Sequence, residues 1–461
     1  MTFGIHLLGN FILLVLKVFV GICFKLIHSQ QIVLPREIRK CNKTNALPCV
    51  RSGTSSPKEF KETELDLLDS ESNVRCELAS KIIMAKDITD IVHAHGYIVH
   101  EHVVRTRDGY LLSIHHILNK GASDLIVNRP VVYLHHGLLT NSELFVLGDT
   151  TSRCLPFRLI DEGYDVWLGN NRGNKYSQKH LKYSTKDNRF WDFSLDEFAI
   201  FDIPDTIDYI LKITKQNELS YIGFSQGSSQ AFAALSLNPD LNSKVNLFVG
   251  LSPAMIPKGL NNEICSYFIS SAPSMLFKLF GRRSIVPSVV FWQRLFGPQL
   301  YEKVVDVSLS FLFNWHIKNI STLQKFIGYP HMFSPTSVKS VVHWFQIIGS
   351  SRFQMYDECG CSGSKLVYLS GAAEKANRVA PFPTRNITTP MLLICGQSDM
   401  LIDMDKLRAQ VIAPMEVINV PGYEHMDTLW ARDVESTVFD KVIKKLEIYT
   451  NKNSKKRAIN L

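Results

Sequence analysis

The pentapeptide Gly223-Phe224-Ser225-Gln226-Gly227 stands between an apolar run at residues 219–224 and an alanine-rich stretch that is typical of a helix start. Two glycines around a serine predict a sharp turn from a strand into a helix, because glycine permits backbone conformations that other residues avoid. Such a turn, a nucleophile elbow, leaves the serine hydroxyl exposed at the sheet edge. The pattern also occurs by chance, so its meaning depends on the strands and helices around it.

Apolar, β-rich runs alternate with helical patterns on both sides of this turn. The expected strands are 131–135, 164–168, 219–224, 245–251, 391–395 and 415–420, and the expected helices are 154–161, 195–213, 226–237, one starting at Asp403, and 434–446. The alternation favours a mostly parallel sheet with helices on both faces, an α/β fold. A hairpin is expected at its start, where 98–105 and 110–118 flank an Asp-Gly turn.

The helix expected at 195–213 has an N-terminal signal and an internal breaker. Ser194 is a cap residue, and Glu197 at the third helical position completes a capping box. Pro204 lies inside the helical pattern, so we expect the helix to kink or to split there.

A serine hydroxyl is a weak nucleophile and needs a base within hydrogen-bond reach, which an acid must orient. In the expected fold these partners follow the serine in the order acid, then histidine, from loops after later strands. Asp399 follows the strand at 391–395, and His425 follows the strand at 415–420. Asp403 and Asp427 compete for the role of the acid, but Asp403 is better explained as a helix cap and Asp427 is only two residues from the histidine.

An acyl transfer also needs donors for the oxyanion that develops in the transition state. We expect one from the backbone N–H of Gln226, which follows the nucleophile, and one from Leu138 in the loop after the strand at 131–135. His135 and His136 precede that loop, and we interpret them as structural because the sequence offers no further ligands for a metal.

Composition narrows the function further. The 461 residues are 45% hydrophobic and carry 51 basic against 43 acidic residues without a basic stripe in the centre, which argues against nucleic-acid binding. Nine cysteines follow no repeating spacing, so they predict neither a disulfide framework nor a metal site. The sequence thus calls for no cofactor, no metal and no obligate protein partner.

Residues 7–27 are long and apolar enough to cross a bilayer, although Asn10, Lys17 and Lys25 interrupt them. A cleaved signal peptide or an interfacial helix is the alternative. Basic residues follow the stretch and none precedes it, which weakly places the rest of the chain in the cytosol. Three glycosylation sequons, at Asn42, Asn319 and Asn386, would be usable only on the lumenal side.

These observations divide the chain into six parts. We expect a membrane anchor at 1–28, a polar linker at 29–87, a first core segment at 88–254, an aromatic-rich inserted cap or lid at 255–385, a second core segment at 386–448 and a basic tail at 449–461. The tail is expected to be solvated and frayed, with attraction to an anionic membrane face as the alternative.

Several longer motifs resemble one known family. They are Tyr133-Leu134-His135-His136-Gly137-Leu138-Leu139, the stretch from Gly163 to Asn174, Phe190-Trp191-Asp192-Phe193-Ser194, the elbow, and Gly422-Tyr423-Glu424-His425. Together they resemble the acid lipase family of α/β-hydrolases, which includes gastric and lysosomal lipases, and the similarity runs from about residue 88 to 448. The N-terminal stretch and the linker most resemble the membrane-anchored steryl ester hydrolases of fungi. The departures are Phe224, where histidine commonly stands, and the cap.

The resemblance implies a catalytic triad of Ser225, Asp399 and His425, with Leu138 and Gln226 as oxyanion donors. It implies a lipid ester hydrolase at the endoplasmic reticulum or a lipid droplet surface, with steryl esters as substrates. A triacylglycerol lipase would use the same triad, and an acyltransferase would use the same acyl-enzyme. A tether or lipid-binding protein without activity is the alternative from another class.

Overall fold

The computed structural model describes the chain at residues 74–121, 129–259, 273–285, 301–310, 313–358 and 379–459. The apolar stretch at 7–27, where a membrane-spanning helix is expected, lies outside these residues, and so does Asn42. Among the helices of the described ranges, none is both long and apolar enough to cross a bilayer.

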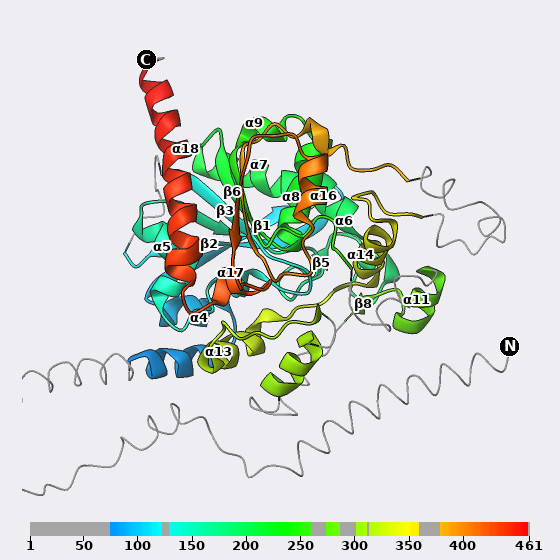
Figure 1. Ribbon diagram of the computed structural model, residues 1–461, viewed down its shortest axis with the longest axis horizontal. Helices are drawn as coiled ribbons and strands as arrows, with labels where there is room; N and C mark the ends of the chain where they lie inside the picture. The colour runs from blue at the N-terminus through cyan, green and yellow to red at the C-terminus, as the bar shows by residue number, and fades with distance from the viewer. Residues whose placement is uncertain are drawn as a thin grey trace, which may run out of the picture.

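Nine strands form one central sheet, which is parallel over most of its width (Figure 1). In sheet order they are β1 (Tyr97–Arg105), β2 (Tyr110–Asn119), β4 (Asp165–Leu168), β3 (Val131–His135), β6 (Leu219–Phe224), β7 (Val245–Leu251), β10 (Met391–Gly396) and β11 (Met415–Val420), with β5 (Lys179–His180) beside β2. β1, β2 and β4 pair antiparallel, and β1 and β2 form the expected hairpin. From β4 to β11 every pair is parallel, which confirms the predicted α/β architecture.

Helices follow the strands as the alternation predicts. They are α4 (Ile88–Ala94), α5 (Leu155–Asp161), α6 (Leu195–Glu197), η4 (Phe198–Asp202), α7 (Ile203–Thr214), α8 (Gln226–Leu237), α9 (Leu241–Lys244), α16 (Met404–Gln410), α17 (Asp427–Trp430), η8 (Glu435–Phe439) and α18 (Asp440–Ile459). Within the described ranges, short 3-10 turns lie in the connecting loops: η1 (Ser142–Phe145), η2 (Thr151–Arg153), η3 (Asn188–Trp191) and η7 (Thr384–Asn386).

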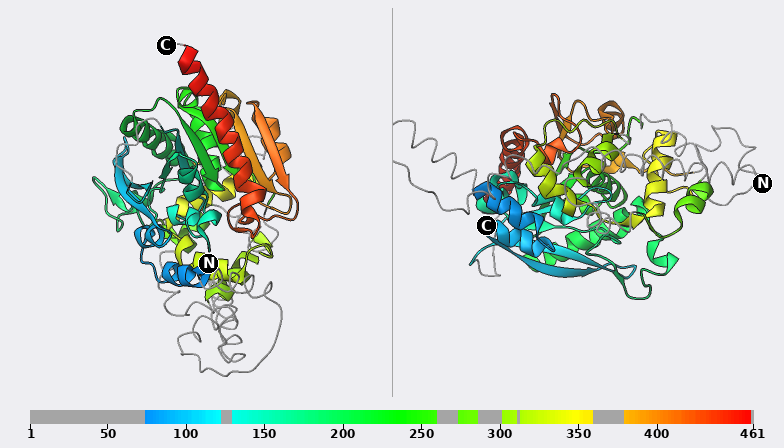
Figure 2. Two further views of the ribbon diagram at one scale, coloured as in Figure 1. Left: turned by 90° about the vertical axis from the view of Figure 1, so that its left-hand side faces the viewer. Right: turned by 90° about the horizontal axis from the view of Figure 1, so that it is seen from below.

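The two faces of the sheet bury two separate apolar cores. Successive strand residues point to opposite faces, so Val132 and Leu134 of β3 join one core and Val131 and Tyr133 join the other. The first core also contains apolar residues of α5 and α18, and the second contains those of α7 and α8. Figure 2 shows α18 running along one side of the sheet near its C-terminal strands. Both faces are therefore covered, as a mostly parallel sheet requires.

The helix expected at 195–213 is present, and a π-helical turn interrupts it just before Pro204. The predicted capping box forms, because the Glu197 carboxylate accepts a hydrogen bond from the Ser194 N–H at 2.6 Å. Residues 198–202 are π-helical, and α7 begins at Ile203. A proline lacks an N–H and crowds the preceding turn of an α-helix, so the wider π turn accommodates it. The predicted break is confirmed in this form.

The π turn ends at Asp202, whose carboxylate meets Arg172 in the interior. Asp202 accepts from Arg172 Nε and Nη2 at 2.9 and 2.6 Å, and Arg172 Nη1 also donates to Asp108 at 2.6 Å. The guanidinium lies 4.0 Å from the ring centroid of Tyr110. Burial raises the pKa of Asp202 to about 6, an effect that the neighbouring Arg172 opposes. The pair ties the helix at 195–214 to the loop after β4.

Between β7 and β10 the alternation of strands and helices stops, as expected for an inserted segment. The described residues there are mostly helical: α11 (Pro273–Phe280), residues 301–310, α13 (Thr322–Met332) and α14 (Val338–Ser350), with β8 (Ser284–Ile285) and β9 (Thr336–Ser337) paired in a small antiparallel sheet. Figure 1 shows α11 and α14 at one end of the sheet and α13 near α17. The limits of the cap at 255 and 385 stay a prediction.

Two of the expected boundaries are wrong. Residues 74–83 are helical, and Ala79 and Ile82 lie in the same core as α4, so the linker expected at 29–87 does not extend through this helix. Cys76, Ala79 and Ile82 are buried and recur at helical spacing, so they form the face of this helix that contacts the core. At the other end, α18 continues through the expected frayed tail to Ile459, because no glycine or proline stops it.

We predict that Asp202→Ala lowers the free energy of unfolding by about 3 to 5 kcal/mol, because it leaves the buried Arg172 short of its counter-charge. The matched control is Asp208→Ala, which removes an exposed partner of Lys244 at 2.6 Å and should cost less than about 1 kcal/mol. Urea unfolding followed by circular dichroism measures both. Equal losses in the two variants would contradict a special role for the buried pair.

Candidate active site

Ser225 occupies the turn between β6 and α8 and is itself the strained residue of that turn. Its backbone has φ +53° and ψ −118°, a conformation that residues with a side chain rarely adopt. The glycines serve another purpose than the expected one. A Cβ on Gly223 would lie 2.6 Å from the N of Ser228, and one on Gly227 would lie 2.2 Å from the O of His135. The elbow therefore needs glycine for close packing, while the serine carries the unusual φ.

The structure brings the three predicted residues into one hydrogen-bonded line. His425 Nε2 lies 2.8 Å from Ser225 Oγ, and His425 Nδ1 lies 2.7 Å from Asp399 Oδ2. The carboxylate on Nδ1 favours the tautomer whose Nε2 is free to accept the serine proton. Asp399 and His425 are buried and Ser225 is partly exposed, so only the hydroxyl end of the line meets solvent.

Each partner comes from a loop at the carboxyl edge of the sheet. Asp399 follows β10, and its other oxygen accepts the N–H of Leu401 at 2.9 Å. His425 follows β11, and its backbone oxygen accepts a hydrogen bond from Ser252 Oγ at 2.7 Å. Ser252, which comes directly after β7 with φ +47°, was not singled out by the sequence. Nothing local marks it, because its partner is remote in the chain.

The competing acids have other partners. Asp403 caps α16 by accepting the N–H of Lys406 at 3.1 Å, as its position predicts. Asp427 accepts from the N–H of Glu424 at 2.7 Å and from Asn319 Nδ2 at 2.8 Å. Neither carboxylate is hydrogen-bonded to His425, so the geometry favours Asp399 as the orienting acid.

The loop after β3 passes directly beside the serine. A Cβ on Gly137 would lie 3.1 Å from the Cβ of Ser225, and Leu139 has φ +59°. The Gly137 oxygen accepts from Thr140 Oγ1 at 3.0 Å, which closes the loop. Among the hydrogen bonds of the described residues, none uses the backbone N–H of Leu138 or Gln226. Both predicted oxyanion donors are thus near Ser225 with their N–H groups unused.

His135 and His136 precede this loop, and hydrogen bonds hold both of their rings in place. His135 bonds Tyr133 Oη at 2.6 Å and Asn171 Oδ1 at 2.8 Å, and His136 Nε2 accepts the N–H of Asn171 at 3.1 Å. Burial lowers the pKa of His135 to about 4 and that of His136 well below its ordinary value, so both rings are neutral near pH 7. Within the described ranges no group of three potential metal ligands includes them.

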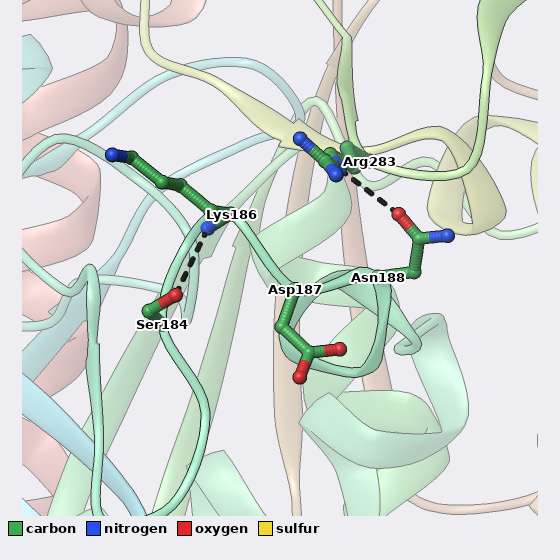
Figure 3. Close-up of a pocket in the computed structure, with 5 residues that line it drawn as sticks. All are labelled: Ser184, Lys186, Asp187, Asn188 and Arg283. Atoms are coloured by element: carbon green, nitrogen blue, oxygen red, sulfur yellow. Dashed lines mark hydrogen bonds between the residues drawn. The ribbon is translucent and has the colours of Figure 1, made fainter.

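The cap reaches the elbow through a tryptophan. Trp344 of α14 donates from Nε1 to the side-chain oxygen of Gln226 at 2.6 Å, and both side chains are buried. The residue that follows the nucleophile is therefore held by the cap as well as by α8. A separate surface depression lies between η3 and β8, lined by Ser184, Lys186, Asp187, Asn188 and Arg283 (Figure 3). None of the site residues lines it, so we assign the chemistry to the elbow.

Comparison with known proteins supports the same fold and class. A family model described as the partial alpha/beta-hydrolase lipase region matches residues 88–149, and one described as the alpha/beta hydrolase fold matches residues 130–431. A solved structure from Sulfolobus solfataricus superposes with a TM-score of 0.52 at 14% identity, covering 76% of this chain and 94% of its own, and shows the fold alone.

Curated relatives extend over most of the chain. A probable lipase of Schizosaccharomyces pombe is 51% identical over 362 residues, which is 78% of this chain and 80% of the relative. A gastric triacylglycerol lipase of Rattus norvegicus is 33% identical and covers 77% of this chain and 90% of its own length. A Crotalus adamanteus protein named as a putative lysosomal acid lipase/cholesteryl ester hydrolase is 32% identical. The match covers 78% of this chain and 90% of that protein. The chain therefore belongs to the acid lipase family of α/β-hydrolases.

Proposed function

We propose that this protein is a membrane-anchored serine lipase that hydrolyses long-chain lipid esters, with steryl esters as its main substrates. The observation that carries the proposal is the line from Ser225 Oγ through the imidazole of His425 to Asp399, with bonds of 2.8 and 2.7 Å. A lipid-binding protein or tether without activity has no need of this line or of a strained serine.

The reaction has two halves. His425 Nε2 takes the proton of Ser225 while the oxygen attacks the ester carbonyl, and the resulting oxyanion is held by the N–H groups of Leu138 and Gln226. His425 then gives its proton to the departing alcohol, which leaves an acyl-enzyme. Water enters, loses a proton to His425 and attacks the acyl carbon. His425 returns that proton to Ser225 Oγ as the fatty acid leaves.

Two observations favour steryl esters as the substrate. The N-terminal apolar stretch and the polar linker resemble the fungal steryl ester hydrolases, and a relative is named for cholesteryl ester hydrolysis. A relative named as a gastric triacylglycerol lipase supports the alternative, a triacylglycerol lipase with the same triad. Both substrates present a long acyl chain, which the aromatic-rich cap would enclose.

The anchor and the compartment are also proposals. Residues 7–27 are long enough to span a bilayer, and the basic residues that follow them favour a catalytic domain in the cytosol. We therefore place the enzyme at the endoplasmic reticulum or at the surface of lipid droplets. The substrate is then a lipid ester of that membrane or droplet.

We predict that Ser225→Ala lowers kcat by about 10⁴-fold or more, since no hydroxyl remains to form the acyl-enzyme. The assay presents cholesteryl oleate and triolein in one emulsion and measures released oleate from each. Ser236→Ala is the matched control, because Ser236 is a buried serine of α8 whose hydroxyl donates to Ala233 O at 2.8 Å. Activity retained in Ser225→Ala would overturn the mechanism, and cleavage of triolein alone would overturn the steryl ester assignment.

The sequons give a test of topology that the structure sharpens. Asn319 Nδ2 donates to Gly422 O at 2.9 Å and to Asp427, so a glycan, which replaces one of the two Nδ2 hydrogens, would break at least one of these bonds. Asn386 is exposed and is the diagnostic sequon among the described residues. For a cytosolic domain we predict that glycosidase treatment leaves the electrophoretic mobility unchanged. A mobility shift that disappears in Asn386→Gln would place the domain in the lumen.

A further inference from the structure

Trp315, from the cap, lies face to face with His425. The two ring centroids are 5.1 Å apart and the ring planes differ by 13°. Both side chains are buried, at 6% and 2% exposure. Ser225 and Asp399 bond the two ring nitrogens and so lie near the plane of the imidazole, whereas the indole covers one of its faces. The cap thus supplies a direct neighbour of the imidazole.

The loop that carries Trp315 is fastened to the loop that carries His425. The Glu424 carboxylate accepts the N–H of His316 at 2.9 Å and that of Ile317 at 2.7 Å. Asn319 Nδ2 donates to the oxygen of Gly422 at 2.9 Å, and the Asn319 oxygen accepts the N–H of Arg432 at 3.1 Å. The cap loop is therefore bonded to this segment before, next to and after the histidine, which leaves Trp315 little freedom to move away.

The backbone of this loop is strained on both sides of the tryptophan. Asn314 has φ +55° and Ile317 has φ +51°. Asparagine tolerates this region, but a β-branched isoleucine there is an outlier with a strained backbone. Such a conformation persists only where its surroundings enforce it, and here the bonds to Glu424 do so.

If Trp315 served only to fill space, its indole N–H would be unfavourable. Trp315 Nε1 is buried and has no hydrogen-bond partner within the described part of the chain. An unpaired buried donor is destabilising, and a phenylalanine or leucine would avoid it. The cost is consistent with a role for the large, electron-rich face of the indole. Tryptophan has the strongest such face for attracting a cation.

We propose that Trp315 is a positioning residue for His425: its indole face holds the plane of the imidazole and stabilises the imidazolium that forms after each proton transfer. The inference rests on the proposed function, because only a reacting histidine becomes charged in the cycle. Phe224 adds a second aromatic ring, whose centroid lies 5.3 Å from that of the imidazole. The attraction acts after the proton has moved, so it favours the transition state over the resting enzyme.

The test compares Trp315→Leu with Trp315→Phe in the full-length protein. The substrate is p-nitrophenyl butyrate, a soluble ester that needs no docking to lipid, and a fluorophosphonate that labels Ser225 counts the folded sites. We expect kcat per labelled site to fall about tenfold in Trp315→Leu and about two- to threefold in Trp315→Phe, because phenylalanine keeps a weaker face. KM should change less than about twofold, since the indole acts on the transition state.

The pH profile separates a change of charge from a change of shape. The acid limb of kcat/KM requires neutral His425, so losing a face that favours the cation should move the midpoint of that limb to lower pH in Trp315→Leu and not in the control. The other groups around the ring are Asp399 after β10, Ser225 at the elbow, Glu424 and Asp427 of its own loop, and His316 next to Trp315. The variants leave all of these in place.

Trp191→Phe is the matched control, because Trp191 is a buried tryptophan whose Nε1 donates to Thr185 O at 2.8 Å. Within the described part of the chain its ring packs against Phe190 and Phe193 and not against His425. Trp191→Phe should reduce thermal stability and leave kcat and the acid limb unchanged. If Trp315→Leu does not fold, Asn319→Ala, which unfastens the same loop without altering a charge, should lower kcat about two- to fivefold at constant KM.

Three results would overturn the role of Trp315. They are wild-type kcat per labelled site in Trp315→Leu, an effect confined to KM, and equal losses in the two Trp315 variants, which would implicate the indole N–H in place of the ring face. The Ser225→Ala variant distinguishes a failure of this inference from a failure of the proposed function. Loss of activity there together with wild-type kcat in Trp315→Leu overturns only the present inference, whereas activity retained in Ser225→Ala overturns both.

Discussion

The site depends on backbone packed directly against backbone at the carboxyl edge of the sheet. A Cβ on Gly227 would lie 2.2 Å from the oxygen of His135, and one on Gly396 would lie 2.1 Å from the oxygen of Tyr423. No side chain fits at either contact, so the elbow packs against the end of β3 and the end of β10 packs against the loop after β11. Because main-chain atoms have no rotamers with which to adjust, these contacts fix the distances between the loops. The bonds of 2.8 and 2.7 Å in the line of Ser225, His425 and Asp399 follow from that rigid frame.

The cap is part of this frame and does not merely cover it. Ser334 donates its N–H to the oxygen of Leu139 at 2.8 Å, and Asn141 Nδ2 donates to the oxygen of His331 at 3.0 Å. Trp344 holds Gln226 from the other side of the serine. Cap residues thus bond the loop of each expected oxyanion donor, and through Trp315 they contact the histidine. A substitution in the cap can therefore also shift Ser225 and His425, through Gln226 and Trp315.

Much of this arrangement was readable from the sequence, because the strands that carry it have local patterns. The boundaries of β3, β6, β7 and α8 match the apolar runs, and Ser225, Asp399 and His425 meet as the order of strands predicts. The sequence does not reveal contacts between residues that are far apart in the chain, because no local pattern marks them. Ser252 reaches His425 across 173 positions, and Glu424 reaches Ile317 across 107. The role of the elbow glycines was misjudged for a related reason, since the need for close packing is visible only when His135 is in place.

Backbone strain is concentrated where these contacts converge. Among the described residues, seven other than glycine have positive φ, and two of them, Lys215 and Ser351, simply end α7 and α14. The remaining five are Leu139, Ser225, Ser252, Asn314 and Ile317, and each lies at or beside a group that contacts the triad. A strained conformation relaxes unless its surroundings over-determine it. The glycine contacts, the Ser252 bond to His425 and the Glu424 clamp supply that constraint, so the two cores of the sheet stabilise a site that its own local sequence would not hold in place.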